Sequence, residues 1–391
     1  MAPRRILYLH ASADLYGSDL LLYELTNHLD RKRFDPIVVL PAHGPLEERF
    51  RGSKTEVLVL NLPVLRRSLF NPGGLGKFVF SFLGSIIRLT RLIKIRRVDL
   101  VHTNTSAVWG GGISARLAGK PHVHSVMELV EDPLFVAKAM AVMTSAFSDK
   151  VIAVSEAVKG HFLKLAPWGS ERYIVLPTPV NMEIYRFSDE GRRRVRSEIG
   201  VSEDTVVVGM AARLNRWKGQ DVFVEACARA LELAGNTKKM HFIILGDPLP
   251  GEEHFELEMQ ARIDELNIRS FVTTRSYQQN FNEWLSAMDV YVLPSKWPEP
   301  NSSGVIAAMA VGLPVVGTNI GGTPEVIIPG ETGMLVPPDD PEAMARAIVE
   351  LVESDSNRLS MGKKARERAR SLYSMDTYAA KVMEIYDELT G

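Results

Sequence analysis

Cysteine is almost absent from this chain of 391 residues, which contains only Cys227. A single cysteine excludes an intrachain disulfide and any metal site built from several cysteines. Disulfides are a feature of oxidising compartments and are rare in the cytosol. The cysteine content therefore favours a cytoplasmic protein.

A long hydrophobic run is also missing. The run Phe78–Ile87 has about half of the roughly 20 residues that a membrane-spanning helix needs. The N-terminus has a basic start but only a short apolar stretch, so we interpret it as a first β-strand and not as a signal peptide. No integral membrane segment is predicted.

Neither sign of charge is in excess. The chain has 46 Lys and Arg against 47 Asp and Glu, which gives a formal net charge of −1. A protein that binds nucleic acid usually carries a basic excess, so we expect no nucleic acid partner. The length allows two or three domains.

Short apolar runs alternate with longer helical patterns along the chain. This alternation predicts parallel sheets with helices on both faces. Twelve strands are too many for one such sheet, so we predict an α/β protein with two doubly wound, Rossmann-like domains. The predicted strands are 5–10, 36–40, 56–60, 99–102, 122–126, 150–154, 173–176, 205–211, 241–245, 272–274, 290–293 and 314–316.

The predicted boundary between the domains lies in 177–196. This stretch has two prolines followed by a polar segment with three consecutive arginines, 192–194. We therefore assign 1–183 to the N-terminal domain and 184–374 to the C-terminal domain. A last helical pattern, Met375–Leu389, follows an irregular spot at 371–374.

Two cations stand in a loop where a ligand is expected. Arg213 and Lys218 follow an apolar strand and precede a helix that opens near Gln220. Loops at the carboxyl ends of strands face the ligand in doubly wound sheets. Arg213 and Lys218 would neutralise a diphosphate there, or they are ordinary surface cations of a solvated loop.

Two further segments combine a strand end with the start of a helix. Gly17 opens an amphipathic helix after the first strand, where a helix N-terminus attracts anions or is simply capped by Ser18 or Asp19. In 293–318 a buried strand leads to Glu299 and then to a small-residue helix. Gly321 and Gly322 with Glu325 follow the next strand, where Glu325 is best explained as a first-turn acid.

Together these motifs resemble one family. The order RLNRWKG, PSKWPEP, AMAVGLPVV, GGTPE and GETGMLVPPDD is similar to that of the retaining GT-B glycosyltransferases of family four, the glycosyl transferases group 1. The segments VIAVSEAVK and LPTPVNMEIY extend the resemblance to the N-terminal half. It implies two Rossmann-like domains facing a central cleft, with the final helix, 375–391, packed back on the N-terminal domain.

The resemblance also implies roles for individual residues. Arg213, Lys218 and Glu299 would be catalytic, with the two cations on the donor diphosphate and Glu299 on hydroxyls of the donor sugar. No metal site and no cofactor are expected, because Arg213 and Lys218 would replace a divalent ion. The donor-binding residues would be Gly17, Asn301, Ser302, Ser303, Gly304 and Ala307.

The sequence departs from the family pattern at two positions. Ala307 stands where the family usually has a second glutamate that binds the donor ribose. The chain therefore binds ribose another way, carries an altered site, or is catalytically weak. Met127 precedes Glu128 where His or Arg is common, which puts any catalytic histidine in doubt. The acceptor-side candidates are His102, Asn104 and Glu128, whereas His122 and His124 are interpreted as structural.

Acidic residues are missing from 57–98, a segment rich in cations. On a helical wheel one face is basic and the other apolar. The cations would contact an anionic membrane, giving access to a lipid-linked acceptor, or would bind a phosphorylated acceptor. If the apolar face only covers a sheet, the excess of charge is unexplained. We expect contact with the inner face of the cytoplasmic membrane through 66–97, which includes Arg66, Arg67, Lys77, Arg88, Arg91, Lys94, Arg96 and Arg97.

The expected function is therefore transfer of a hexose, with retention and without a metal, from a nucleoside-diphosphate sugar to a hydroxyl of a lipid-linked or polysaccharide acceptor. UDP-sugars are favoured as donors. The alternative is a catalytically weak or non-catalytic protein that binds nucleotide-sugar in a polysaccharide assembly complex. A third interpretation keeps the fold but makes phosphate or water the acceptor.

Overall fold

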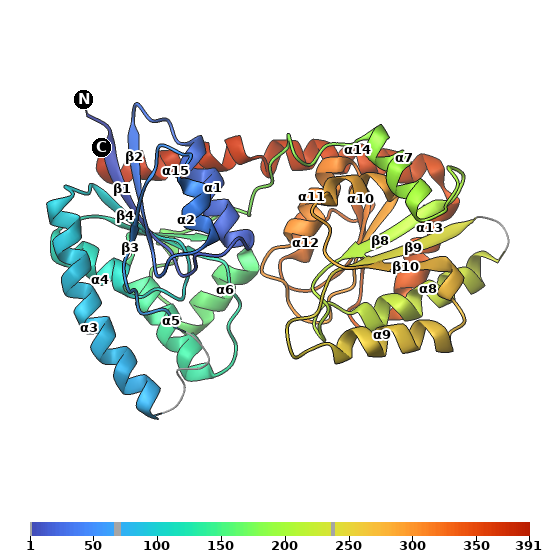
Figure 1. Ribbon diagram of the computed structural model, residues 1–391, viewed down its shortest axis with the longest axis horizontal. Coiled ribbons are helices and arrows are strands. Elements are labelled where there is room, and N and C mark those ends of the chain that lie inside the picture. Colours follow the sequence, from blue (N-terminus) through green and yellow to red (C-terminus); the bar gives the residue numbers. More distant parts are fainter. Residues whose placement is uncertain (1, 66–71, 236–238) are drawn as a thin grey trace. The chain divides into compact units, whose positions relative to one another are not determined.

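The computed structural model describes residues 2–65, 72–235 and 239–391, and the side chains of 72–79 are not described. The chain forms two compact units, 1–178 with 375–391 and 179–374. We refer to them as the N-terminal unit and the C-terminal unit (Figure 1).

The N-terminal unit is a parallel sheet of seven strands in the order β3-β2-β1-β4-β5-β6-β7. Sequence neighbours β1 and β2 pair, and β1 then pairs with β4 on its other side, so the topological switch point lies between β1 and β4. The elements are β1 (Arg4–Leu9), α1 (Gly17–His28), β2 (Phe34–Leu40), α2 (Pro45–Phe50), β3 (Glu56–Val59), α3 (Pro72–Ile95), β4 (Leu100–Thr103), α4 (Gly110–Ala118), β5 (His122–Val126), α5 (Leu134–Phe147), β6 (Lys150–Ala153), α6 (Glu156–Leu165), β7 (Tyr173–Val175) and α15 (Met375–Thr390).

The C-terminal unit repeats this plan with six parallel strands in the order β10-β9-β8-β11-β12-β13. Its switch point lies between β8 and β11. The elements are α7 (Asp189–Glu198), β8 (Val206–Ala211), α8 (Gln220–Ala234), β9 (Met240–Leu245), α9 (His254–Glu265), β10 (Val272–Arg275), α10 (Phe281–Ala287), β11 (Val290–Leu293), α11 (Ser303–Val311), β12 (Val315–Thr318), α12 (Thr323–Val326), β13 (Gly333–Val336), α13 (Pro341–Glu353) and α14 (Asp355–Leu372).

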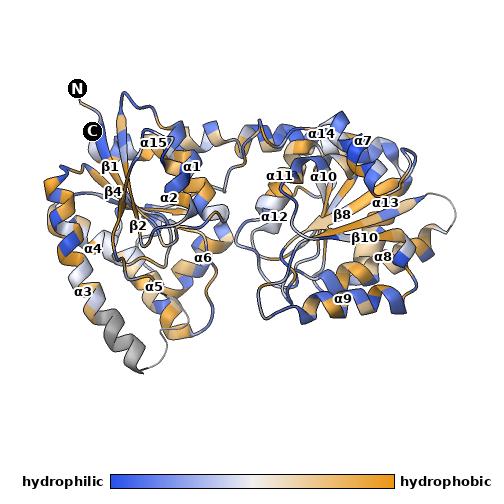
Figure 2. Cartoon of the chain, in the orientation of Figure 1, coloured by the Kyte–Doolittle hydropathy of each residue, from blue (hydrophilic) through white to orange (hydrophobic). Residues whose placement is uncertain are grey.

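The alternation of side chains between the two faces of the sheet explains why each unit has helices on both sides of its sheet. In β1, Ile6 and Tyr8 join the cluster with α1, α2 and α15, while Leu7 and Leu9 join the cluster with α3 and α4. Successive side chains of a strand point to opposite faces of the sheet, so a strand that is apolar throughout must be covered on both faces. The strand β8 is accordingly orange in Figure 2.

The prediction of two doubly wound domains is confirmed. Every predicted strand is present, with ends that shift by no more than about two residues. The prediction missed β13, a short edge strand that begins at Gly333 and pairs with β12. The polar stretch expected at the boundary contains α7, which is anchored in the C-terminal unit through Arg196.

The final helix α15 belongs to the N-terminal unit (Figure 1). Its Tyr386 hydroxyl lies 2.7 Å from the Tyr8 hydroxyl and 2.5 Å from Nδ1 of His102, and all three side chains are buried. Within the described residues, no helix is both long enough and apolar enough to span a membrane.

Candidate functional site

The residues predicted from sequence fall in both units. The C-terminal unit carries Arg213, Lys218, Glu299, Asn301, Ser302, Ser303, Gly304 and Ala307, and the N-terminal unit carries Gly17, His102, Asn104 and Glu128. In the C-terminal unit they follow β8 and β11, the strands that flank the switch point. In the N-terminal unit Gly17 follows β1, His102 lies within β4, Asn104 follows β4, and Glu128 follows the next strand, β5. The carboxyl ends of the strands form the edge where ligands bind in open α/β sheets.

Lys218 and Glu299 meet at the switch point of the C-terminal unit. Lys218 lies in the loop after β8, Glu299 lies in the loop after β11, and Nζ of Lys218 is 2.6 Å from Oε1 of Glu299. The side chain of Glu299 is only 10% exposed, and that of Lys218 is 25% exposed. The structure therefore brings together two of the three residues that the resemblance makes catalytic.

Three hydrogen bonds hold the loop that carries Glu299. The hydroxyl of Ser295 donates to the same Oε1 at 2.6 Å. The hydroxyl of Thr318 donates to the carbonyl of Ser295, and the amide of Gly322 donates to the carbonyl of Glu299 at 2.7 Å. These bonds fix the carboxylate before a ligand arrives, which is the preorganisation that electrostatic catalysis requires.

Gly321 explains why the glycine pair stands beside Glu299. Its φ is +60°, and a Cβ atom there would lie 2.6 Å from both the amide nitrogen and the carbonyl oxygen of Glu299. Only glycine allows both the left-handed conformation and this approach of two backbones. Gly321 therefore serves the close packing of its own loop against the Glu299 loop.

Helix α11 presents its N-terminus next to this loop. Ser302 is the N-cap, and its hydroxyl accepts from the amide of Val305 at 3.4 Å. Ser303 is exposed at the first helical position, and Asn301 and Gly304 are partly buried. The free amides and the macrodipole make this end of α11 suitable for a phosphate group.

Ala307 lies one turn further along α11 and is 2% exposed in an apolar cluster. Its methyl group offers no hydrogen-bond acceptor. The structure thus places no carboxylate at this position of α11, in agreement with the departure noted in the sequence.

Arg213 follows β8 on the surface. Its backbone carbonyl accepts from Nε2 of Gln220 at 2.9 Å, which ties the two ends of the loop. Gly219 (φ +70°) turns the chain into α8, where a Cβ atom would lie 2.0 Å from the carbonyl oxygen of Pro294. The side chain of Arg213 is exposed, so its guanidinium is available to an anion.

The switch point of the N-terminal unit holds a buried polar chain that the sequence did not reveal. Nε2 of His10 lies 2.5 Å from Oδ1 of Asp19, and the amide of Asn104 lies 3.2 Å from Nδ1 of His10. All three side chains are at most 1% exposed. Asp19 also accepts from the amide of Tyr16 at 2.8 Å. This chain fixes the loop that ends at Gly17.

Glu128 and Gly17 border the same edge. Oε2 of Glu128 accepts from the hydroxyl of Ser106 at 2.6 Å and from the amide of Met127 at 3.1 Å. Glu128 is partly exposed, and Gly17 is exposed with no atom within 4 Å of a built Cβ. These two residues are therefore accessible to a ligand.

His102 has a packing role in the structure. Both ring nitrogens are engaged, Nδ1 with Tyr386 and Nε2 with the hydroxyl of Ser125 at 2.7 Å. Burial lowers the pKa of His102 to about 3, and burial lowers the pKa of His124 to about 4. The ring of His122 is likewise bonded, to Thr103 and to the carbonyl of Phe147.

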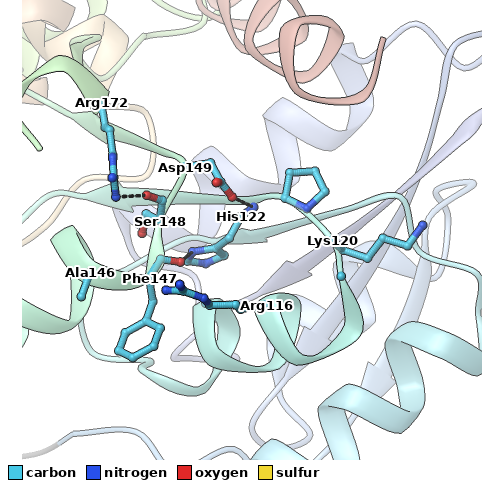
Figure 3. A pocket seen from close by; sticks show the side chains of 11 residues that line it. Arg116, Lys120, His122, Ala146, Phe147, Ser148, Asp149 and Arg172 are labelled. Carbon is cyan, nitrogen blue, oxygen red and sulfur yellow. Dashed lines mark hydrogen bonds between the residues drawn. The ribbon is translucent and has the colours of Figure 1, made fainter.

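A hollow of about 530 Å³ lies at the opposite edge of the sheet, where β5 and β6 begin (Figure 3). Arg116, Lys120 and Arg172 line it. Figure 3 shows Arg172 donating to the carbonyl of Ser148, and it also donates to that of Ser145. Cations at the C-terminal ends of helices stabilise the free carbonyls there. Arg172 thus caps the C-terminal end of α5 at this hollow.

Both halves of the chain match family models. Residues 17–184 match the model described as Glycosyltransferase Family 4, and residues 191–368 match the model described as Glycosyl transferases group 1. Together the two matches leave only the chain ends and a short segment between them unmatched.

Curated relatives agree with this result. The chain is 34% identical over 222 residues to the D-inositol 3-phosphate glycosyltransferase of Paenarthrobacter aurescens. The aligned region covers 56% of this chain and 52% of that protein. It is 24% identical to spore coat protein SA of Bacillus subtilis, over 76% of this chain and 80% of that protein. The chain thus spans about half the length of the inositol phosphate glycosyltransferases that it matches.

Solved structures share the whole fold. The structure of Anabaena HepE in complex with UDP superposes with a TM-score of 0.84 at 23% identity, over 98% of this chain and all of that chain. A glycosyltransferase from Rickettsia africae has a TM-score of 0.84 at 21% identity, over 100% of this chain and 99% of that one.

Proposed function

The chain belongs to the group 1 class of family-four glycosyltransferases, and on this premise we propose that it transfers a hexose from a nucleoside-diphosphate sugar to a hydroxyl group of an acceptor, with retention of the anomeric configuration. UDP is the favoured nucleotide. The UDP and UDP-glucose complexes of Anabaena HepE, whose fold is shared, support this choice.

The observation that carries the proposal is the Lys218–Glu299 pair at the switch point. A fixed carboxylate accepts hydrogen bonds from sugar hydroxyls, and an ammonium group at 2.6 Å from it would reach the diphosphate next to that sugar. The N-terminus of α11 and the exposed Arg213 add positive potential to the same loops. These groups together suit a sugar joined to a diphosphate.

The proposed reaction breaks the bond between the anomeric carbon and the diphosphate oxygen and forms a bond to the acceptor oxygen on the same face of the sugar. The acceptor hydroxyl proton passes to the departing diphosphate. Negative charge grows on the diphosphate in the transition state, so Arg213, Lys218 and the α11 amides would stabilise it most at that moment. These cations would act in place of a divalent metal, so no metal is required.

The proposed acceptor is a lipid-linked glycan or a polysaccharide that binds at the switch point of the N-terminal unit. Glu128 is an accessible polar group at this edge of the sheet. Glu128 is held by Ser106 and has free acceptor capacity for a hydroxyl group.

Access to a lipid-linked acceptor would come from α3. Ile86, Leu89 and Ile93 on its apolar face are buried, and Leu89 and Ile93 join the cluster with β1 and β2. A second apolar stripe is exposed, with Phe80, Leu83 and Ile87 at 84%, 56% and 55%. Arg88, Arg91 and Lys94 are exposed on the same helix, whereas Arg66 and Arg67 and the side chain of Lys77 lie outside the described residues.

An exposed apolar stripe beside cations suits an anionic bilayer surface. Flotation with phosphatidylglycerol vesicles at low salt tests this part of the proposal. Leu83→Asp should abolish flotation, and Leu257→Asp, at an exposed leucine on α9, should leave it unchanged. Absence of wild-type binding would contradict peripheral membrane contact.

The rival function is binding of nucleotide-sugar without transfer, and Ala307 favours it. Without the usual glutamate at position 307, the site would bind the donor ribose more weakly by a few kcal/mol. Turnover separates the two functions. The proposed transferase releases UDP from a UDP-sugar at a measurable rate in EDTA, and Arg213→Ala slows it. A protein that shifts its melting temperature with UDP-sugars but releases no UDP with any acceptor is a binding protein.

A further inference from the structure

Two exposed tryptophans stack beside the candidate donor site. Trp217 precedes Lys218, and Trp297 stands two positions before Glu299. Their ring centroids are 5.6 Å apart with an interplanar angle of 16°. The residues remain 45% and 53% exposed. Two adjacent exposed rings form a contiguous apolar patch, which is a candidate binding surface.

The backbone beneath the rings is ordered by hydrogen bonds. The amide of Lys296 donates to the carbonyl of Trp217 at 2.8 Å, which joins the two loops. The amide of Trp217 donates to Oδ1 of Asn215 at 3.0 Å. Because the loops are already fixed, a ligand that stacks on an indole face loses little free energy to ordering them.

The surroundings of the pair are polar and partly acidic. Nζ of Lys296 lies 2.9 Å from Asp221 and 3.1 Å from Asp339, and both carboxylates are more than half exposed. Lys296 and Asp221 line a hollow of about 640 Å³, and Arg216, which precedes Trp217, lines it as well. The chain neighbours of the two tryptophans, Arg216 and Lys296, thus line this hollow, and Lys296 holds the two carboxylates.

From this arrangement we propose that Trp217 and Trp297 form a sugar-binding platform for a neutral glycan. The apolar C–H face of a pyranose packs on an aromatic ring, while carboxylates accept hydrogen bonds from its hydroxyl groups. Lys296 pairs with both Asp221 and Asp339, and their exposed oxygens retain acceptor capacity, so these groups suit the hydroxyls of a neutral glycan.

This inference rests on the proposed function, because the glycan would be the acceptor chain or the product of sugar transfer. The binding itself does not require transfer. The protein can therefore bind a saccharide even if it transfers no sugar. Failure of the sugar-binding proposal is thus distinguishable from failure of the proposed function.

The test is intrinsic tryptophan fluorescence of the full chain during titration with maltohexaose, cellohexaose and chitohexaose, without a donor. We expect saturable quenching by at least one of them. Trp297→Ala should weaken that binding by about tenfold or more, and Trp297→Phe, which keeps an aromatic face, should weaken it less. Trp168→Ala, at a tryptophan 48% exposed in the N-terminal unit, is the matched control and should leave the affinity unchanged.

A second readout separates a lost sugar contact from a collapsed loop. The thermal shift caused by UDP should be the same in Trp297→Ala as in the wild type, because the indole does not touch the diphosphate in this proposal. The proposal is overturned if none of the three saccharides binds, if Trp168→Ala weakens binding as much as Trp297→Ala, or if Trp297→Ala loses the UDP shift together with the saccharide.

Discussion

Lys218 and Glu299 are 81 positions apart in the chain, yet their side chains are joined at 2.6 Å where the order of strands reverses between β8 and β11. The contact makes one site from two loops. It also makes each residue dependent on the other, because loss of either leaves a charged group without its partner.

Lys218→Ala should weaken UDP binding by about ten- to a hundredfold. The change removes a charge-assisted hydrogen bond to the diphosphate and leaves the Glu299 carboxylate free to repel it. Isothermal titration with UDP measures the effect. Lys363→Ala, at an exposed lysine on α14, is the control and should bind as the wild type does. Equal affinities of the two variants would remove Lys218 from the site.

Gly17→Ala should lower turnover without destabilising the fold. A Cβ atom at Gly17 meets no atom within 4 Å, so the free energy of unfolding should change by less than about 0.5 kcal/mol. Turnover should nevertheless fall, because the methyl group would occupy the space that the ligand approaches. Gly160→Ala, at another open glycine on α6, should leave turnover unchanged. Unchanged turnover in Gly17→Ala would place the ligand elsewhere.

Stability should fall in mild acid because of the buried histidines. Burial lowers the pKa of His102 to about 3 and that of His124 to about 4, so both are neutral in the folded protein at pH 5. In the unfolded chain they take up protons as the pH falls below about 6.5. The unfolded state then binds more protons, and the free energy of unfolding drops by up to about 1.4 kcal/mol per pH unit for each histidine between pH 6.5 and about 4.

Urea unfolding at pH 7.5, 6.0 and 5.0 measures this dependence. His43→Gln, at a histidine whose side chain is 81% exposed, should leave the slope unchanged. A free energy of unfolding that stays constant over this range would contradict the neutral, buried state of His102 and His124.

Arg196→Ala should destabilise the C-terminal unit by about 3–5 kcal/mol. Arg196 is 1% exposed and donates to Asp289 at 2.5 Å and to the carbonyls of Ala287 and Thr205. Truncation leaves Asp289 and these carbonyls without that donor. Chemical denaturation of the variant measures the loss. Arg193→Ala, at an exposed position of the same helix, should cost less than about 0.5 kcal/mol.

The sequence was sufficient for the fold because the strands are apolar on both faces. A run such as 206–211 has no polar alternation, which identifies a central parallel strand. The missed strand β13 has only three apolar residues, 334–336, between Gly333 and Pro337, so its apolar run is too short to be distinguished from a loop.

The candidate site was predicted only in part. Lys218 and Glu299 stand in motifs, and their loops follow strands, so the sequence was sufficient to select them. Ser295 and His10 escaped notice, and Asp19 was considered only as a helix cap, because the conformation of a loop decides which of its polar side chains meet. The Trp217–Trp297 pair likewise becomes visible only when two loops are seen side by side.

The central claim is that the Lys218–Glu299 site supports sugar transfer without a metal. The most direct measurement is UDP release from a panel of UDP-hexoses in excess EDTA, by the wild type and by Glu299→Gln, which keeps the shape of the side chain but removes its charge. We predict turnover by the wild type with at least one donor and a loss of about a hundredfold in Glu299→Gln. Turnover that requires added Mg²⁺ or Mn²⁺, or that is the same in both proteins, would contradict the account.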